Sequence, residues 1–202
     1  MEIIKNFNLK DKKPDIRYLK EMKKVVYDQE WFENASPDIE LYYMYRGIKE
    51  DDNLRYDITI IPAKKLGKEF VKTKGHYHMG NFGEIYIVLK GKAIYLLQKR
   101  GEDNLTISDV YYIEAKKNEI AVIPPQYGHI TINPSERDEL IMANWVSKDC
   151  KSDYLPIEEA RGACYFFTQD GWVKNKNYKV VPELYSQRPR KTLPADLNFL
   201  NG

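Results

Sequence analysis

Short strand-like segments separated by turn residues fill the middle of this chain of 202 residues. Within them polar and apolar residues alternate, and many of the sixteen tyrosines fall there, which is typical of β-strands. No crossover helix fits between them, which argues against a parallel α/β sheet. The sequence therefore predicts an all-β jelly roll or small closed sandwich. The expected strands are residues 39–46, 55–62, 69–73, 76–78, 84–89, 93–98, 110–114, 119–123, 128–133 and 140–146.

The segments on either side of this region follow other patterns. We expect an edge strand or arm at residues 1–13, a helix at 14–26 that begins at Pro14, and a loop at 31–37. A turn is expected at residues 47–53. The helix prediction rests on apolar residues spaced three or four apart and on the i,i+4 pair Arg17 and Glu21.

The C-terminal part predicts a helical turn, a hairpin and an extended tail. The helical turn is expected at residues 157–161, and the hairpin would pair 165–168 with 178–181 around Asp170-Gly171. The basic tail, 187–194, is interrupted by prolines and would be solvated or lie as a strap over the barrel or a partner subunit. We expect one domain over residues 1–202, with a core barrel at about 40–155, an N-terminal arm and helix at 1–38, and a C-terminal extension at 156–202.

Composition limits the classes of partner. The net charge is only +2 and the charges are interspersed, so a nucleic-acid partner is not expected. No apolar run approaches membrane-spanning length, and the N-terminus lacks the apolar core of a signal peptide. We expect a soluble cytoplasmic protein without a membrane partner. Cys150 and Cys164 could pair, but the default for such a protein is two reduced thiols.

Two of the chain's three histidines, His76 and His78, lie one residue apart and would face the same way on a strand. A turn that contains Gly80 and Gly83 then leads to Glu84, whose carboxylate can return to the two imidazoles. The third histidine, His129, comes from a distant strand. Three nitrogens and one oxygen are a donor set that suits a divalent transition metal.

A lone His-x-His pair is weak evidence, because most such pairs are ordinary surface or core histidines. Three further facts favour a metal site in this chain. No histidine is used elsewhere, Glu84 and Gly91 fall at hairpin spacing, and His129 follows the strand entry Pro124-Pro125.

These segments resemble the two metal-binding motifs of the cupin superfamily. The first motif opens with Thr73-Lys74-Gly75 and runs through residues 84–91, a detail that is similar to the archaeal cupin-type glucose-6-phosphate isomerase family. The similarity covers about residues 40–155. It implies a double-stranded β-helix, a homodimer, and interconversion of glucose 6-phosphate and fructose 6-phosphate.

The resemblance also implies roles for individual residues. His76, His78, Glu84 and His129 would hold the metal. Iron is the first candidate for this metal, and manganese, nickel and zinc are the alternatives. The substrate phosphate would lie near Thr59, Thr73 and Gly75. Apart from the resemblance, the charge of Lys74 is available beside them, although a lysine next to a binding loop is more often simply solvated. Tyr86 would face the sugar, and Tyr154 matches a later tyrosine of the family.

Isomerisation moves a proton between C2 and C1 of the sugar. A cation near O1 and O2 would stabilise a cis-enediolate, and Glu84 is the best candidate for the base. Metal coordination would lower the basicity of Glu84, so its two roles are in tension. A hydride shift is the rival mechanism.

The chain departs from the family after His129. Where the family places a tyrosine and then a histidine near the sugar, the approximate counterparts are Trp145 and residues 148–153, without a histidine. The turn between His78 and Glu84 holds five residues, one fewer than in some members. The family's metal-binding and phosphate-binding residues therefore have clearer counterparts in this chain than its residues for ring opening and proton transfer.

Two other functions fit the same metal ligands. One is another metal-dependent cupin enzyme, an iron oxygenase or decarboxylase, which would not need Thr59, Thr73 and Gly75. The other is a cupin that binds a sugar or effector without turnover.

Overall fold

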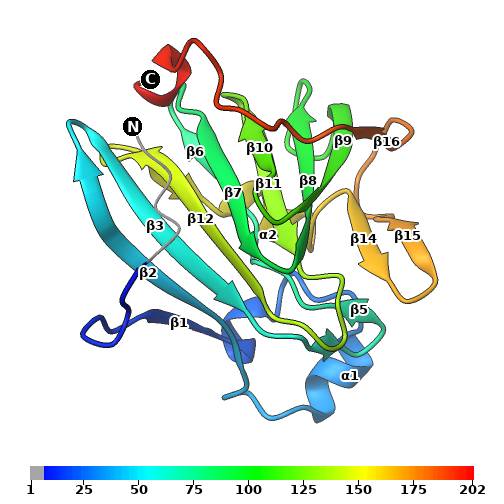
Figure 1. Ribbon diagram of the computed structural model, residues 1–202. Coiled ribbons are helices and arrows are strands. Elements are labelled where there is room, and N and C mark those ends of the chain that lie inside the picture. The colour runs from blue at the N-terminus through cyan, green and yellow to red at the C-terminus, as the bar shows by residue number, and fades with distance from the viewer. Residues whose placement is uncertain (1–6) are drawn as a thin grey trace.

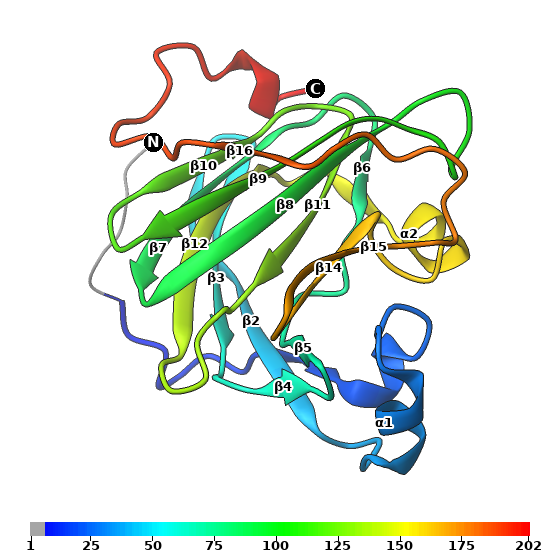
Figure 2. The same ribbon diagram turned by 90° about the vertical axis from the view of Figure 1, so that its right-hand side faces the viewer.

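Two large β-sheets curve around a shared interior (Figures 1 and 2). The computed structural model describes residues 7–202. One sheet has six strands in the order β1-β2-β3-β12-β7-β10, and the other has four in the order β11-β8-β9-β16. A two-stranded sheet, β13-β6, and a four-stranded sheet, β15-β14-β5-β4, complete the structure. The jelly-roll class predicted from the sequence is confirmed.

The strands of the six-stranded sheet are β1 (Asp15–Tyr18), β2 (Glu40–Asp51), β3 (Leu54–Ile61), β12 (Leu140–Ser147), β7 (Glu84–Lys90) and β10 (Ile120–Ile123). Those of the facing sheet are β11 (Tyr127–Ile132), β8 (Lys92–Arg100), β9 (Ile107–Lys116) and β16 (Tyr185–Gln187). The smaller sheets contain β13 (Lys151–Asp153), β6 (Tyr77–Met79), β15 (Gly171–Lys174), β14 (Tyr165–Thr168), β5 (Glu69–Phe70) and β4 (Lys65–Leu66). The helical elements are η1 (Leu19–Met22), α1 (Gln29–Asn34), α2 (Leu155–Glu159) and η2 (Asn198–Leu200).

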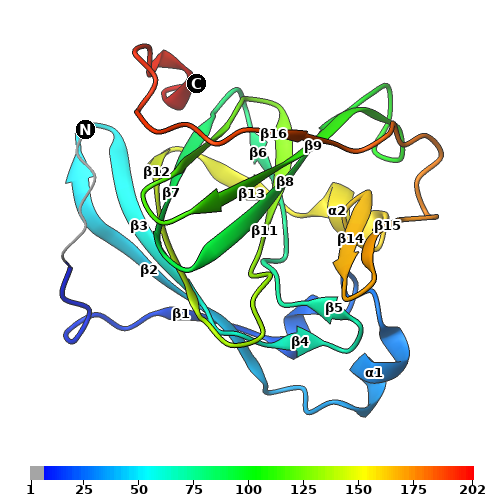
Figure 3. The same cartoon turned by 45° about the vertical axis from the view of Figure 1, so that its right-hand side comes forward.

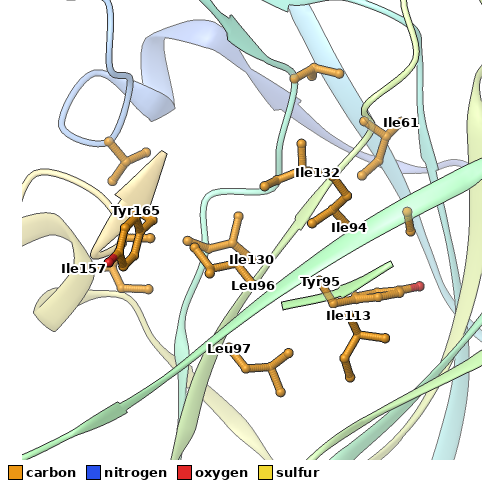
Figure 4. Packing of buried hydrophobic residues seen from close by; sticks show 14 of the residues in the cluster. Ile61, Ile94, Tyr95, Leu96, Leu97, Ile113, Ile130, Ile132, Ile157 and Tyr165 are labelled. Atoms are coloured by element: carbon orange, nitrogen blue, oxygen red, sulfur yellow. The ribbon is translucent and has the colours of Figure 1, made fainter. Parts of the chain in front are cut away.

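Burial of apolar side chains occurs on both faces of the six-stranded sheet. The larger cluster lies between the two sheets and includes Tyr95, Leu97 and Ile130 (Figure 4). The second cluster covers the outer face of the six-stranded sheet, and we call it the outer cluster. Its buried members are Tyr56, Ile58, Ile85, Ile87, Leu89, Ile120, Ala143, Trp145 and Leu200. Because both faces are covered, strands β7 and β12 are apolar along nearly their whole length.

The helix predicted at residues 14–26 is wrong. Residues Asp15–Tyr18 form the edge strand β1, in which Ile16 lies opposite Tyr43, and only Leu19–Met22 make a 3-10 turn. Pairing with β2 supplies backbone hydrogen bonds that outweigh the helical spacing of the apolar residues. The pair Arg17 and Glu21 does form, at 2.7 Å, across the junction of strand and turn.

The loop predicted at residues 31–37 is also partly wrong, because α1 occupies its first half. Asp28 caps this helix by accepting a hydrogen bond from the backbone N–H of Trp31 at 3.1 Å. The arm expected at 1–13 falls partly outside the described residues, and residues 7–13 form no strand.

Four further features differ from the sequence prediction. Strand β2 continues to Asp51 through a bulge after Tyr45, so the expected turn at 47–53 shrinks to residues 52–53. Strand β5 ends at Phe70. The C-terminal hairpin pairs β14 with β15 rather than with 178–181, because Thr168 faces Gly171 across a two-residue turn. The helical turn expected at 157–161 starts earlier, at Leu155.

The tail lies along the barrel as a strap. Strand β16 pairs in parallel with β9, and the chain then crosses the end of the barrel to η2 (Figure 3). Cys150 is half-buried and Cys164 is buried, and both are free thiols. Within residues 7–202 no helix is long and apolar enough to cross a bilayer.

A buried ion pair attaches the N-terminal segment to the barrel. Lys72 Nζ lies 2.7 Å from Glu69 Oε2 and donates a second hydrogen bond to the carbonyl of Val25 at 2.8 Å. Glu69 in turn accepts the backbone N–H of Tyr27 at 2.7 Å. Both charged side chains are almost fully buried, so each depends on the other for compensation.

We expect Lys72→Met to destabilise the protein by about 3–5 kcal/mol, because Glu69 would be left as an uncompensated buried charge. The double variant Glu69→Gln, Lys72→Met should recover most of that loss. Urea unfolding of the wild-type protein and the three variants measures the coupling. Equal destabilisation in the single and double variants would contradict this account.

Candidate metal centre and substrate pocket

Four side chains from three regions of the chain meet in the interior of the barrel. His78 lies on β6, Glu84 opens β7 after the turn, and His129 lies on β11. His76 lies just outside β6, where it exchanges backbone hydrogen bonds of 3.3 Å and 3.0 Å with His129. One potential ligand atom from each of the four lies within 4.8 Å of the others.

The geometry of this group fits a metal ion. Glu84 Oε2 is 3.4 Å from His78 Nε2 and 3.1 Å from His129 Nε2. The ring of His76 is centred 4.6 Å from that of His129 and 5.2 Å from that of His78. Glu84 Oε2 is buried and accepts no hydrogen bond from any residue between 7 and 202. A buried carboxylate oxygen that faces imidazole nitrogens is satisfied when a cation lies among them.

Neighbouring groups orient two of the four side chains. His78 Nδ1 is 3.0 Å from the carbonyl of Phe82, so Nδ1–H donates to it and Nε2 faces the centre. Asn144 Nδ2 donates to Glu84 Oε1 at 2.6 Å, which leaves Oε2 for the centre. The hydroxyl of Tyr86 lies 3.3 Å from His129 Nε2.

The charges of the group depend on one another. Burial lowers the pKa of His76, as do His129 and His78, and burial also lowers the pKa of His129. Burial opposes the charge of His78, but Cys150 and Glu84 outweigh it and raise the pKa of His78 to about 10. Burial alone would raise the pKa of Glu84, yet the imidazoles of His129 and His78 hold it well below its usual range. Without metal, the group therefore contains a carboxylate and one imidazolium.

The residues proposed for phosphate binding line the same pocket. Thr59 points into it from β3, and Thr73 and Gly75 lie on the segment before β6. The hydroxyl of Thr73 accepts the backbone N–H of Thr131 at 2.9 Å and keeps its own proton for another acceptor. Gly75 has φ of 80°, and a Cβ there would collide with Ile130, so only glycine fits.

Tyr154 and Lys74 lie beside these residues. The ring of Tyr154, at the start of α2, is centred 5.5 Å from the ring of His76. Lys74 Nζ lies 5.2 Å from the Tyr154 ring centroid and pairs with Glu158 at 2.6 Å. The pocket thus brings together every site residue predicted from the sequence: His76, His78, Glu84, His129, Thr59, Thr73, Gly75, Tyr86 and Tyr154.

Comparison with known proteins shows to which family the chain belongs. A family model described as glucose-6-phosphate isomerase matches residues 16–183. The chain belongs to the glucose-6-phosphate isomerase family. The glucose-6-phosphate isomerase of Thermococcus litoralis is 31% identical over 157 residues, which cover 75% of this chain and 78% of the relative. That of Pyrococcus abyssi is 30% identical over 165 residues, which cover 79% and 83%.

This isomerase-family chain also resembles part of some larger solved structures. An oxalate decarboxylase from Lactobacillus farciminis in complex with formate superimposes with a TM-score of 0.44 and 16% identity. The overlap covers 69% of this chain and 32% of that one. The sequence comparisons establish the family, and the resemblance inferred from the cupin motifs is confirmed.

Trp145 does not take the place of the family's tyrosine near the sugar. Its side chain is 1% exposed and packs against Tyr56 in the outer cluster. Its neighbours on β12, Asn144 and Val146, face the pocket instead. Residues 148–153 contribute Cys150 and Ser152 to the pocket lining. The alternation of side chains along β12 could have revealed Asn144, because an outward tryptophan places its neighbours inward.

A group of charged side chains at the pocket was also not predicted from the sequence. Arg55 Nε donates to Asp57 Oδ2 at 2.9 Å, and Arg46 Nη1 lies 3.6 Å from the same oxygen. Arg55 and Asp57 alternate with Thr59 along β3, so their spacing could have placed them on the pocket face. Arg46 joins them only through the pairing of β2 with β3.

We expect Asn144→Leu to weaken metal binding by about 10–100-fold, because the amide that orients the carboxylate of Glu84 is removed while the volume is kept. Val146→Ala, on the same strand and in the same pocket, is the matched control and should keep wild-type affinity. Competition with a metal-indicator dye measures both. Unchanged affinity in Asn144→Leu would contradict an orienting role.

Metal binding at about pH 8 should release roughly one proton per ion, because His78 with its raised pKa must lose a proton to become a ligand. His76 and His129, with lowered pKa values, are already neutral there. Calorimetric titrations in buffers of different ionisation enthalpy give the number of protons as a slope. A slope near zero would show that His78 is neutral before the metal binds.

Proposed function

We propose that this protein interconverts glucose 6-phosphate and fructose 6-phosphate with the help of one divalent metal ion. The observation that carries the proposal is a single pocket that holds both the group of His76, His78, Glu84 and His129 and the cradle of Thr59, Thr73 and Gly75. Membership in the glucose-6-phosphate isomerase family supports the same substrates.

The cradle would bind the phosphate of the substrate through neutral donors. Thr59 and Thr73 supply hydroxyl groups, and the absence of a side chain at Gly75 permits close approach of an oxygen to the backbone. Lys74, next in the chain to both Thr73 and Gly75, adds a positive charge beside this position. The sugar would then extend from the cradle toward the histidines.

The three imidazoles and Glu84 Oε2 would hold the metal, for which we place iron ahead of manganese, nickel and zinc. When bound, the metal supplies Lewis-acid stabilisation of negative charge on the O1 and O2 oxygens of the sugar. The buried, unbonded Oε2 of Glu84 and the inward Nε2 of His78 fit this role. Asn144 keeps the other carboxylate oxygen away from the centre.

Glu84 is the only carboxylate of the group, and it would move the proton through Oε2 once that oxygen has left the metal. It would take the proton from C2 of the open-chain aldose, while the electron pair of that C–H bond forms the C1–C2 double bond and the carbonyl electrons move onto O1. Return of this proton to C1, with transfer of the O2 hydroxyl proton to O1 and formation of the carbonyl at C2, gives the ketose. The hydroxyl of Tyr86 stays protonated, because burial and Glu84 raise its pKa, and it would donate to a sugar oxygen.

The cradle predicts a dependence on the phosphate group that the rival cupin functions lack. Thr73→Val removes the hydroxyl, and we expect KM for fructose 6-phosphate to rise at least about tenfold, as for the loss of a hydrogen bond to a charged group. Thr73→Ser, which keeps the hydroxyl, should remain near the wild-type KM. A coupled assay for glucose 6-phosphate formation measures both. Equal KM values in all three proteins, or equal turnover of unphosphorylated fructose, would contradict the proposal.

A further inference from the structure

The C-terminal residues 184–202, which we call the C-terminal strap, lie beyond the part of the chain matched by the family model. We infer that this strap positions the turn between His78 and Glu84 and thereby sets the affinity of the metal centre. The inference rests on the metal site of the proposed function. It concerns residues that touch neither the metal ligands' donor atoms nor the substrate pocket.

The strap is attached to the barrel at several points. Strand β16 pairs in parallel with β9, with Tyr185 opposite Tyr111. Further along, Arg190 and Ile120 exchange two backbone hydrogen bonds of 2.8 Å and 2.9 Å at the edge of β10. Figures 1 and 3 show the strap crossing the barrel end and finishing beside the upper ends of β6 and β7.

The end of the strap is anchored by Leu200. This side chain is fully buried in the outer cluster, together with Ile85, Leu89 and Trp145. Ile85 follows Glu84 directly in the chain. Leu200 therefore packs in the cluster that also fixes the start of β7.

The same short helix holds the metal-site turn by its backbone. The N–H of Gly83 donates to the carbonyl of Phe199 at 2.7 Å. The ring of Phe199 lies so close to Gly83 that a Cβ at this glycine would collide with it. A Cβ there would also meet the carbonyl oxygen of Ile123 at the end of β10, so a glycine is needed because both the strap and β10 approach the turn closely.

The residues on either side of Gly83 connect this contact to the metal ligands. The preceding carbonyl, that of Phe82, accepts the hydrogen bond that orients His78, and the following residue is Glu84 itself. The spacing between these two ligands is set by the turn. Because Phe199 holds Gly83, the last residue of the turn, displacement of the strap would move two of the four ligand side chains.

A strap that only covered apolar surface would stabilise the fold without changing the metal centre. Leu200→Ala and Leu89→Ala separate the two roles, because both remove a leucine side chain from the outer cluster. Leu200 belongs to the helix that holds Gly83, whereas Leu89 lies near the far end of β7. Both variants should lose thermal stability.

The experiment titrates the metal-free, full-length proteins with Co²⁺ and monitors binding through the d–d absorption of the bound ion. We expect Leu200→Ala to weaken Co²⁺ binding by about 10–100-fold and to change the spectrum, while Leu89→Ala keeps the wild-type affinity and spectrum. A truncation after Pro194, which keeps β16 and the Arg190 bridge, should behave like Leu200→Ala. If the truncated chain does not fold, the two leucine variants decide the question alone.

Two results would have different meanings. Wild-type affinity and spectrum in Leu200→Ala, or equal weakening in Leu89→Ala, would overturn the inference about the strap. Failure of the wild-type protein to bind Co²⁺ would instead refute the metal site, and the inference would fall with it. Hydrogen exchange gives a readout without metal: the Gly83 amide should exchange faster in Leu200→Ala than in Leu89→Ala.

Discussion

The pair of backbone hydrogen bonds between His76 and His129 is the contact on which the site depends. These residues are far apart in the sequence, because His76 directly precedes β6 and His129 lies on β11. Their pairing places the imidazoles face to edge, with ring centres 4.6 Å apart. Once they are joined, His78 and Glu84 need only a short turn to complete the group. The pairing of the two segments thus brings together ligands that lie far apart in the sequence.

The four ligand side chains also impose an electrostatic constraint. A carboxylate and three imidazoles are buried together, so the charge of one must be balanced by the others or by a cation. Asn144 neutralises part of this cost at Glu84 Oε1, whereas Oε2 has no hydrogen bond within the described chain. The pocket next to this centre is lined by threonine hydroxyls and by the charged side chains of Arg46, Arg55 and Asp57. That combination is suited to a sugar phosphate whose two ends need different kinds of recognition.

Local periodicity accounts for what could be predicted from the sequence. Short runs of apolar and β-branched residues between turn residues predicted the strands from β2 to β12 with the exception of β4 (Lys65–Leu66), and the scarcity of histidines singled out the metal ligands. The helix expected at 14–26 failed because its backbone pairs with β2, a distant segment that local spacing does not show. Asn144 and Phe199 were missed for a related reason. Each acts on Glu84 or its turn from a residue far away in the chain.

The strand β12 illustrates the difference between a motif and a structure. Trp145 was matched to a sugar-facing tyrosine by position, yet it lies in the outer cluster with Tyr56. A shift of one residue along a strand moves a side chain to the opposite face. Pocket residues on this strand are therefore fixed by the register with β3 and β7, in which Asn144 lies opposite Asp57 and Tyr86.

The most direct test of the account is the isomerase activity of metal-stripped protein as metal is added back in sub-stoichiometric steps. The account predicts that conversion of fructose 6-phosphate to glucose 6-phosphate is negligible without metal. It should rise linearly until about one ion is bound per chain, and then stay constant. Full activity in the stripped protein, or tightly bound metal without any turnover, would contradict the claim that this centre performs the isomerisation.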